Sequence, residues 1–168
     1  IVLYAGNSST QQINTNIKPE FVWIKARNAT YNHGLGDVVR GANKLLQANT
    51  PNGEYPGTNC ISAFGTNSFT VGDDDHVNDT GKNYVAWNWK ANGSGSSNTD
   101  GSINTSKTSA NVAGGFSIST YTGNATEGAT VGHGLSKIPE LVLVKKRSGS
   151  AGWYMYHSGF GATKNMEM

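Results

Sequence analysis

Short apolar stretches separated by polar, glycine-rich segments are the main pattern along this chain. Residues 21–25 and 141–144 are continuous apolar runs rich in β-branched and aromatic types, which is typical of strands covered on both faces. Residues 84–90 alternate instead, so that Trp87 and Trp89 share one side of a strand. We therefore predict strands at all three places and expect these two tryptophans to lie in the core.

Helix signals are weak elsewhere in the chain. The best helical candidate, residues 38–46, contains Gly41, which lowers helix propensity, so we interpret this segment as strand, tight turn and strand. Further short strands are predicted at residues 69–71, 116–121 and 153–157. Many short strands joined by turns predict an all-β fold. We expect an antiparallel β-sandwich of the jelly-roll or concanavalin-like lectin type, built from tandem modules.

One block of sequence occurs twice. Pro-Glu-Phe-Val-Trp-Ile-Lys-Ala-Arg at residues 19–27 returns as Pro-Glu-Leu-Val-Leu-Val-Lys-Lys-Arg at residues 139–147. Gly-Ala-Asn-Lys at 41–44 returns as Gly-Ala-Thr-Lys at 161–164, at the same offset of 120 residues. Self-similarity at a fixed offset indicates repeated structural units. We therefore predict one module of about 120 residues and the opening part of a second.

The repeat divides the chain into three parts. We expect residues 1–92 to form a nearly complete first β module and residues 113–168 to form the start of a second, homologous module. Residues 93–112 are rich in glycine, serine and asparagine, which is typical of a linker or connecting arm. The chain is then a stretch of a longer tandem array, with one internally duplicated domain as the alternative. Trp23 matches Leu143 across the repeat, so both are predicted in equivalent buried sites.

The charge, the lengths of the apolar runs and the cysteine content limit the partners and cross-links that we expect. The net charge is +2, and the basic residues are scattered singly, whereas nucleic-acid binding needs a basic stripe. No apolar run approaches the length that spans a bilayer. We therefore expect neither a nucleic-acid partner nor membrane insertion. Cys60 is the only cysteine, so packing and strand pairing must hold the fold without an intrachain disulfide.

The acidic loop at residues 73–79 is the best candidate for a metal site. Asp73, Asp75, Asn78 and Asp79 offer oxygens of the kind that calcium prefers. Their spacing lacks the terminal bidentate glutamate and the fixed glycine of an EF-hand loop. We therefore interpret the loop as a solvated turn and predict neither a metal nor a cofactor.

No set of residues in the sequence indicates catalysis. A serine or cysteine nucleophile needs a histidine held by an acid, and no histidine recurs at equivalent points of the two modules. We therefore expect a protein that is not an enzyme. Tyr31, Tyr55 and Tyr154 are the candidate ligand-binding residues, because exposed tyrosines beside asparagine-rich loops are typical of sugar- and protein-binding surfaces.

Several strings resemble one family of proteins. Residues 21–25, 39–46 and 83–91 of the first module, and 121–124 and 131–135 of the second, are similar to a module that recurs in predicted tail-fibre and other virion proteins of marine bacteriophages. The resemblance covers nearly the whole chain except the linker. It implies tandem β-rich modules in a virion appendage, with a lectin-like sandwich fold. Asn88 departs from the pattern, since related modules often carry cysteine there.

The same resemblance implies a function. We expect a non-enzymatic structural protein of an extracellular virion, a tail-fibre or receptor-binding module that contacts the bacterial surface. Its expected partners are further copies of the chain or other virion proteins, with a bacterial surface glycan as a candidate ligand. Two alternatives stay open: a capsid decoration or filament subunit, and a secreted glycan-binding or glycan-active module.

Overall fold

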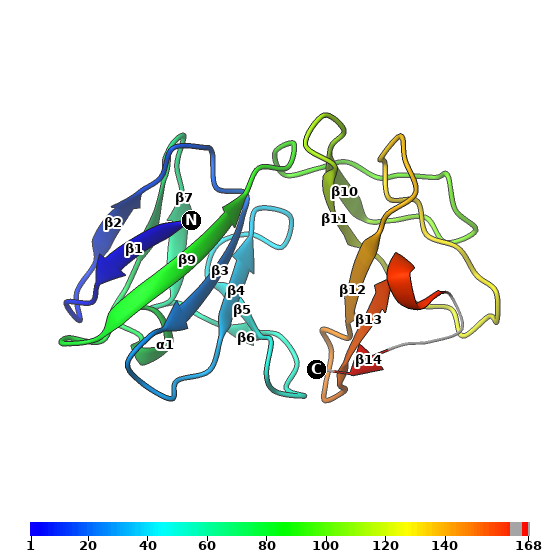
Figure 1. The fold of residues 1–168 in the computed structure, drawn as a ribbon. Coiled ribbons are helices and arrows are strands. Elements are labelled where there is room, and N and C mark those ends of the chain that lie inside the picture. The colour runs from blue at the N-terminus through cyan, green and yellow to red at the C-terminus, as the bar shows by residue number, and fades with distance from the viewer. Residues whose placement is uncertain (162–165, 168) are drawn as a thin grey trace.

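A computed structural model describes residues 1–161 and 166–167, and it consists mainly of short strands (Figure 1). Every pairing between its named strands is antiparallel, so the predicted all-β antiparallel fold class is confirmed. In chain order the elements are β1 (Val2–Ala5), β2 (Gln11–Asn14), β3 (Phe21–Ala26), β4 (Gly34–Asp37), β5 (Lys44–Gln47), β6 (Tyr55–Pro56), β7 (Ile61–Phe64), β8 (Ser68–Val71), α1 (Asp75–Asn78), β9 (Asn83–Trp89), β10 (Lys107–Asn111), β11 (Phe116–Thr120), β12 (Leu141–Lys145), β13 (Trp153–His157), η1 (Ser158–Phe160) and β14 (Met166–Glu167).

The first unit, residues 1–92, is a sandwich of two sheets. The larger sheet has the strand order β1-β9-β3-β4-β5-β6, and the smaller sheet, β2-β8-β7, covers one of its faces. Val22 and Ile24 of β3 point into the space between the sheets, where they pack with residues of the smaller sheet such as Phe69 and Val71. This apolar layer is the main core, and burying it is the chief driving force for folding of the unit.

Strand β9 buries the face opposite to the one that was predicted to lie in the core. Tyr84 and Ala86 are fully buried in the main core, whereas Trp87 is half-buried and Trp89 is 37% exposed. The prediction that the two tryptophans lie in this core is therefore wrong. Alternation fixes which residues share a face but not which face meets the second sheet. Tyr84 is able to be buried because its hydroxyl accepts from the Asp79 N–H at 2.8 Å and donates to the Asp75 carbonyl at 2.7 Å.

The second unit repeats part of the larger sheet. Strands β12, β13 and β14 follow one another as β3, β4 and β5 do. Leu141 pairs with His157 as Phe21 pairs with Asp37, at the repeat offset of 120 residues. The pairing of β14 with β13 likewise matches that of β5 with β4. The two segments therefore form the same three-stranded arrangement in the same register.

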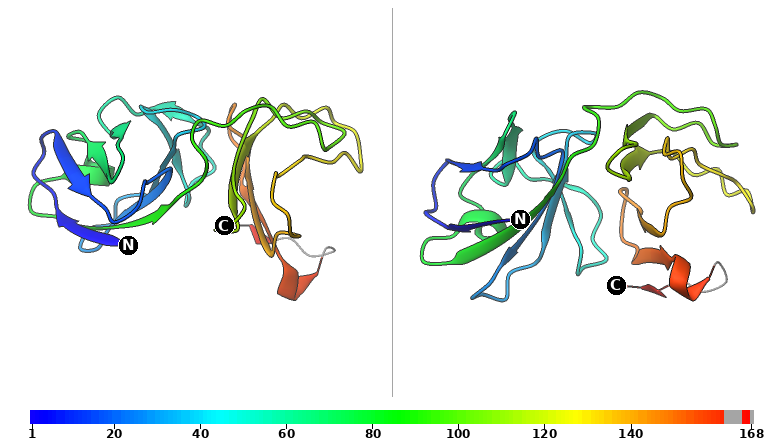
Figure 2. Two further views of the ribbon diagram at one scale, coloured as in Figure 1. Left: turned by 90° about the horizontal axis from the view of Figure 1, so that it is seen from above. Right: turned by 45° about the horizontal axis from the view of Figure 1, so that its top comes forward.

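The second unit packs against the outer face of the first (Figures 1 and 2). Trp153 of β13 is buried in a second hydrophobic cluster with Leu35, Leu46 and Ala48, and half-buried Phe21, Trp23 and Leu143 pack against it. Trp23 and Leu143 thus contribute to one shared cluster, but neither is fully buried as predicted. The β12–β13–β14 sheet forms a third layer beside the sandwich.

The predicted linker is only partly without regular structure. Its last part, Lys107–Asn111, is strand β10, which pairs with β11 in a hairpin. Earlier in the segment, Ser96 forms a β-bridge with Thr108, and Ile103 forms one with Val131. Phe116 of β11 stacks on Trp89 with ring centroids 6.0 Å apart. The connection therefore rests on both units. Within the described residues, no helix is both long and apolar enough to cross a membrane.

Candidate functional site

Glu54 is the centre of an ion cluster that joins the two units. Its carboxylate accepts from Nε and Nη2 of Arg147 at 3.0 and 2.8 Å, and from Nη1 of Arg40 at 3.2 Å. Burial by itself raises the pKa of Glu54, but the hydrogen bonds and charges of Arg147 and Arg40 outweigh that effect and hold the pKa below its usual range. The Glu54 backbone N–H also donates to the Arg147 carbonyl at 2.8 Å.

Arg40 is the buried and rigidly held member of this cluster. Its side chain is buried, and Nε donates to Oδ2 of Asp37 at 2.5 Å while Nη2 donates to the Leu35 carbonyl at 3.0 Å. The other Asp37 oxygen accepts from the Arg40 backbone N–H at 2.8 Å. A buried charge is tolerated only when it is paired and hydrogen-bonded, and this one has both kinds of partner. The guanidinium is therefore held in one place beneath Glu54.

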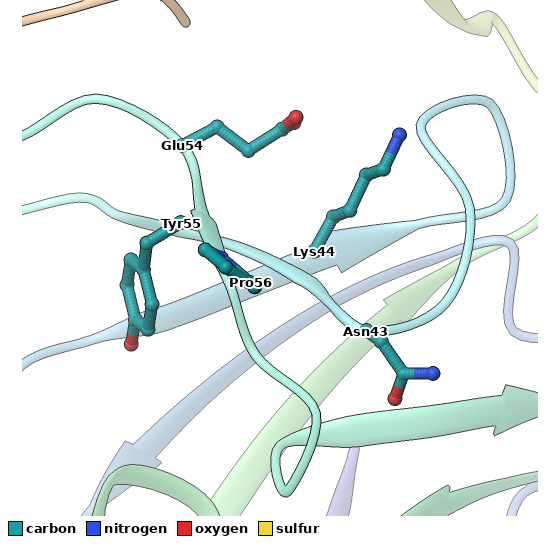
Figure 3. A pocket seen from close by; sticks show the side chains of 5 residues that line it. All are labelled: Asn43, Lys44, Glu54, Tyr55 and Pro56. Atoms are coloured by element: carbon teal, nitrogen blue, oxygen red, sulfur yellow. The ribbon is translucent and has the colours of Figure 1, made fainter.

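A shallow pocket of about 220 Å³ lies beside the cluster (Figure 3). It is lined by Asn43, Lys44, Glu54, Tyr55 and Pro56. Lys44 and Asn43 offer an ammonium and an amide at this opening, which together provide donors and an acceptor for hydroxyl-rich ligands such as sugars. Both oxygens of Glu54 are already bound by the arginines. The ring of Tyr55 points away from the Lys44 and Glu54 side chains (Figure 3), so it does not offer a stacking platform to a ligand between them.

Tyr55 instead contacts a network of polar side chains. His76 Nδ1 lies 3.0 Å from Oδ1 of Asp74, and its Nε2 lies 3.1 Å from Nε2 of Gln47. The hydrogen bond that His76 donates to Asp74 raises the pKa of His76 and lowers the pKa of Asp74. Cys60 adjoins the same carboxylate. Asp74 thus has His76 on one side and Cys60 on another, although the sequence gives these residues no catalytic spacing.

This network does not activate the cysteine. Cys60 is buried, and its pKa is raised, first by burial and then by the negative charge of Asp74. A thiol acts as a nucleophile only as the thiolate, and a raised pKa keeps Cys60 protonated at neutral pH. Asp74 contacts both the thiol and His76, and its negative charge disfavours the thiolate. The arrangement therefore links the loop before α1 to the buried Cys60.

The three candidate tyrosines do not converge. Tyr31 lies with its ring 6.2 Å from His76, and its hydroxyl donates to Oδ2 of Asp79 at 2.8 Å. Tyr55 is at the other end of the same polar network. Tyr154 belongs to β13 of the second unit and is 46% exposed. The structure therefore brings the first two to one region and leaves Tyr154 as a separate surface residue.

Two residues of the candidate metal loop direct their polar groups at the protein itself. Asn78 is fully buried, and its amide donates to the carbonyls of Ser9 and Gly72 at 2.5 and 2.6 Å. Asp79 accepts from Tyr31, and Asp75 begins the short helix α1. Asp73 precedes this turn. Over residues 1–161 and 166–167, no three His, Cys, Asp or Glu side chains gather as a metal site would require.

Sequence reasoning missed the Glu54 cluster. Arg40 and Glu54 meet within the first unit, and Arg147 joins them only when the second unit packs on the first. The one local signal was Asp37 and Arg40 at a spacing of three residues, which is common in turns.

The fold and this junction define the class: an all-β protein in which a sandwich carries a second, repeated antiparallel sheet on its outer face. The chain belongs to the family described as Domain of unknown function (DUF7483), which matches residues 1–168. Comparisons with curated proteins and with solved structures find no match.

Proposed function

We propose that this chain is part of a non-enzymatic, modular structural protein of a bacteriophage virion, a tail-fibre or receptor-binding module that contacts the bacterial surface. The observation that carries the proposal is the repeated sheet. Strands β12, β13 and β14 copy the register of β3, β4 and β5, and the copy packs directly on the original. Repeated units that contact their neighbours are the construction principle of extended, array-like proteins.

The junction supports a rigid array. Trp153 inserts into the outer face of the first unit, and its Nε1 donates to the Gln47 carbonyl at 2.9 Å. Lys145 Nζ donates to the Pro51 carbonyl at 2.9 Å, and Glu54 joins Arg147 to Arg40. An apolar anchor surrounded by directional hydrogen bonds fixes the angle between two units. An appendage that transmits contact over a distance needs this property.

The surface beside the junction is the proposed contact with a bacterial glycan. Lys44 and Asn43 provide an ammonium and an amide beside a shallow opening, and such groups bind sugar hydroxyls through hydrogen bonds. Further copies of the chain or other virion proteins are the proposed assembly partners. The virion resemblance of residues 21–25 and 83–91 supports an extracellular location on the virion.

Electron microscopy with gold-labelled antibodies against the chain tests the proposal on particles purified from its source. Gold along or at the tip of an appendage is the expected result. Gold spread over the capsid shell would indicate a decoration protein instead, and antigen found only in the particle-free supernatant would indicate a secreted glycan-binding protein. Preimmune antibodies on the same grids are the control.

A further inference from the structure

Strand β12 has an open edge. Its counterpart β3 is paired on both edges, with β9 on one side and β4 on the other. Among the described residues, β12 is paired with β13 alone. A strand edge carries a row of backbone donors and acceptors that favours pairing with a further strand.

The residues that face this edge follow from the alternation of the backbone. Ser158 N–H donates to the Glu140 carbonyl at 2.8 Å, so every second residue from Glu140 directs its backbone groups at β13. The backbone groups of Leu141, Leu143 and Lys145 therefore face the open edge. The matching residues of β3 face β9, as the hydrogen bond from Arg27 N–H to the Asn83 carbonyl at 2.7 Å shows.

An apolar face adjoins the edge. Val142 and Val144 are each 37% exposed, whereas the equivalent Val22 and Ile24 are 0% exposed. Tyr154 lies directly opposite Val144 on β13 and is also exposed. A contiguous apolar surface beside unpaired backbone groups is typical of an interaction site.

The lysine of β12 does not cover the open edge of this strand. Lysine side chains that reach over an edge strand discourage pairing, but Lys145 Nζ is bound by the carbonyls of Pro51 and Ala151 at 2.9 and 2.5 Å. Its ammonium is held at the junction between the units and does not cover the edge. The open stretch of β12 ends near Arg147, whose carbonyl accepts from Glu54 N–H.

The face of β13 shows that a strand fits this site better than a covering sheet. In the first unit, a Cβ added at Gly36 would lie 2.8 Å from Cδ1 of Ile61, so the smaller sheet approaches β4 closely only because glycine is there. The equivalent residue of β13 is Tyr156, which pairs opposite Val142. A second sheet therefore cannot approach β13 as it approaches β4, while the edge of β12 stays available.

We propose that the open edge of β12 binds an antiparallel β-strand of the same chemistry as β9, donated by a module of the same kind. Strand addition of this type takes its affinity from main-chain hydrogen bonds and its selectivity from alternate side chains. The added strand would take the place beside β12 that β9 takes beside β3. The inference rests on the pairing and exposure of β12 compared with those of β3, and it is independent of the virion assignment.

The two edges of β9 supply a matched pair of probes. Gly6 N–H donates to the Lys82 carbonyl at 2.9 Å, so the backbone groups of Tyr84 and Ala86 face β1. Those of Val85 and Trp87 face β3. A synthetic peptide of residues 82–91, N-methylated at Val85 and Trp87, loses the donors for β12. The same peptide N-methylated at Tyr84 and Ala86 keeps them, with identical composition and the same number of methyl groups.

The experiment adds each peptide to the full chain and measures affinity, together with hydrogen exchange at the amides of Leu141 and Leu143. We expect the unmodified and the Tyr84/Ala86-methylated peptides to bind and to slow exchange at these two amides. Methylation at Val85 and Trp87 should weaken binding by about tenfold or more, since two hydrogen bonds are lost.

Three outcomes would overturn the proposal. One is equal binding by the two methylated peptides, and another is no binding by the unmodified peptide at millimolar concentration. The third is protection confined to residues 21–26, which would place the peptide on β3.

Discussion

The pKa values of two histidines in this protein are shifted in opposite directions because their neighbours differ. His33 accepts a hydrogen bond on Nδ1 from Trp23 Nε1 at 2.8 Å, and burial followed by the charge of Lys25 lowers its pKa. His76 is hydrogen-bonded to Asp74, and this bond raises its pKa. The neutral ring is thus favoured at His33 and the charged ring at His76.

We expect the His76–Asp74 pair to stabilise the protein at low pH. The pKa of His76 is raised in the folded state, so its contribution is fully present below the unfolded value of 6.5 and is lost as the pH rises through the folded pKa. His76→Gln should therefore lower the free energy of unfolding more at pH 6 than at pH 8, measured by urea titration.

His33 is the internal comparison for this measurement. Its pKa is lowered in the folded state, so its contribution is present above 6.5 and declines as the pH falls towards the folded pKa. His33→Gln should accordingly flatten the acid side of the stability profile. Identical pH profiles for the two variants would contradict both assignments.

Cys60 is expected to be inert until the protein unfolds. Its thiol is 1% exposed and its pKa is raised, chiefly by burial, and both effects suppress the reactive thiolate. A disulfide reagent in excess should label the native chain at a rate proportional to the unfolded population, and should label the urea-unfolded chain at once. Rapid labelling of the native chain would show that the Asp74 network is open.

At the scale of elements, the equivalent strands β3 and β12 have different surroundings. β3 and β12 have the same register with their neighbours and nearly the same apolar pattern. β3 is covered on both faces and both edges, as its continuous apolar run predicts. β12 is covered on one face, although its sequence gave the same prediction. The run of apolar residues identified both strands but carried no information on what would cover them.

This difference predicts unequal effects of one substitution. Val22→Ala removes two methyl groups from a fully buried site and should cost about 2 kcal/mol of stability. Val142→Ala removes the same groups at the equivalent, partly exposed site and should cost less than about 0.5 kcal/mol. Urea unfolding of the two variants provides the comparison. Equal losses would mean that β12 is covered in solution.

At the scale of the whole molecule, one aromatic side chain holds the second unit in place. Trp153 is buried against β4 and β5 and is hydrogen-bonded to the Gln47 carbonyl. Of the apolar residues in β12 and β13, Trp153, Leu143 and Met155 are covered at least in part, while Leu141 remains 51% exposed. The first unit therefore takes up much, but not all, of that surface.

Trp153→Ala should separate the stabilities of the two units. Loss of a buried tryptophan costs about 3–5 kcal/mol, and nearly all of this should fall on β12 and β13. Hydrogen exchange should accelerate across residues 141–157 and stay slow in the main core. Tyr154→Ala, on the opposite face of the same strand, is the control and should change neither region. Equal acceleration in both units would show that they unfold as one.

The sequence by itself determined the most apolar strands and the repeat, while short strands such as β1, β2 and β6 carried no sufficient local signal. Apolar runs, glycine-rich turns and the offset of 120 residues are local or self-referential signals, and the β-strand periodicity converts them directly into structure. Only the tertiary structure decided which face of β9 is buried, that Tyr31 and Tyr55 meet one polar network, and that Glu54 joins Arg40 to Arg147. These outcomes depend on contacts between distant segments, and no local pattern encodes which of two apolar faces another layer will cover.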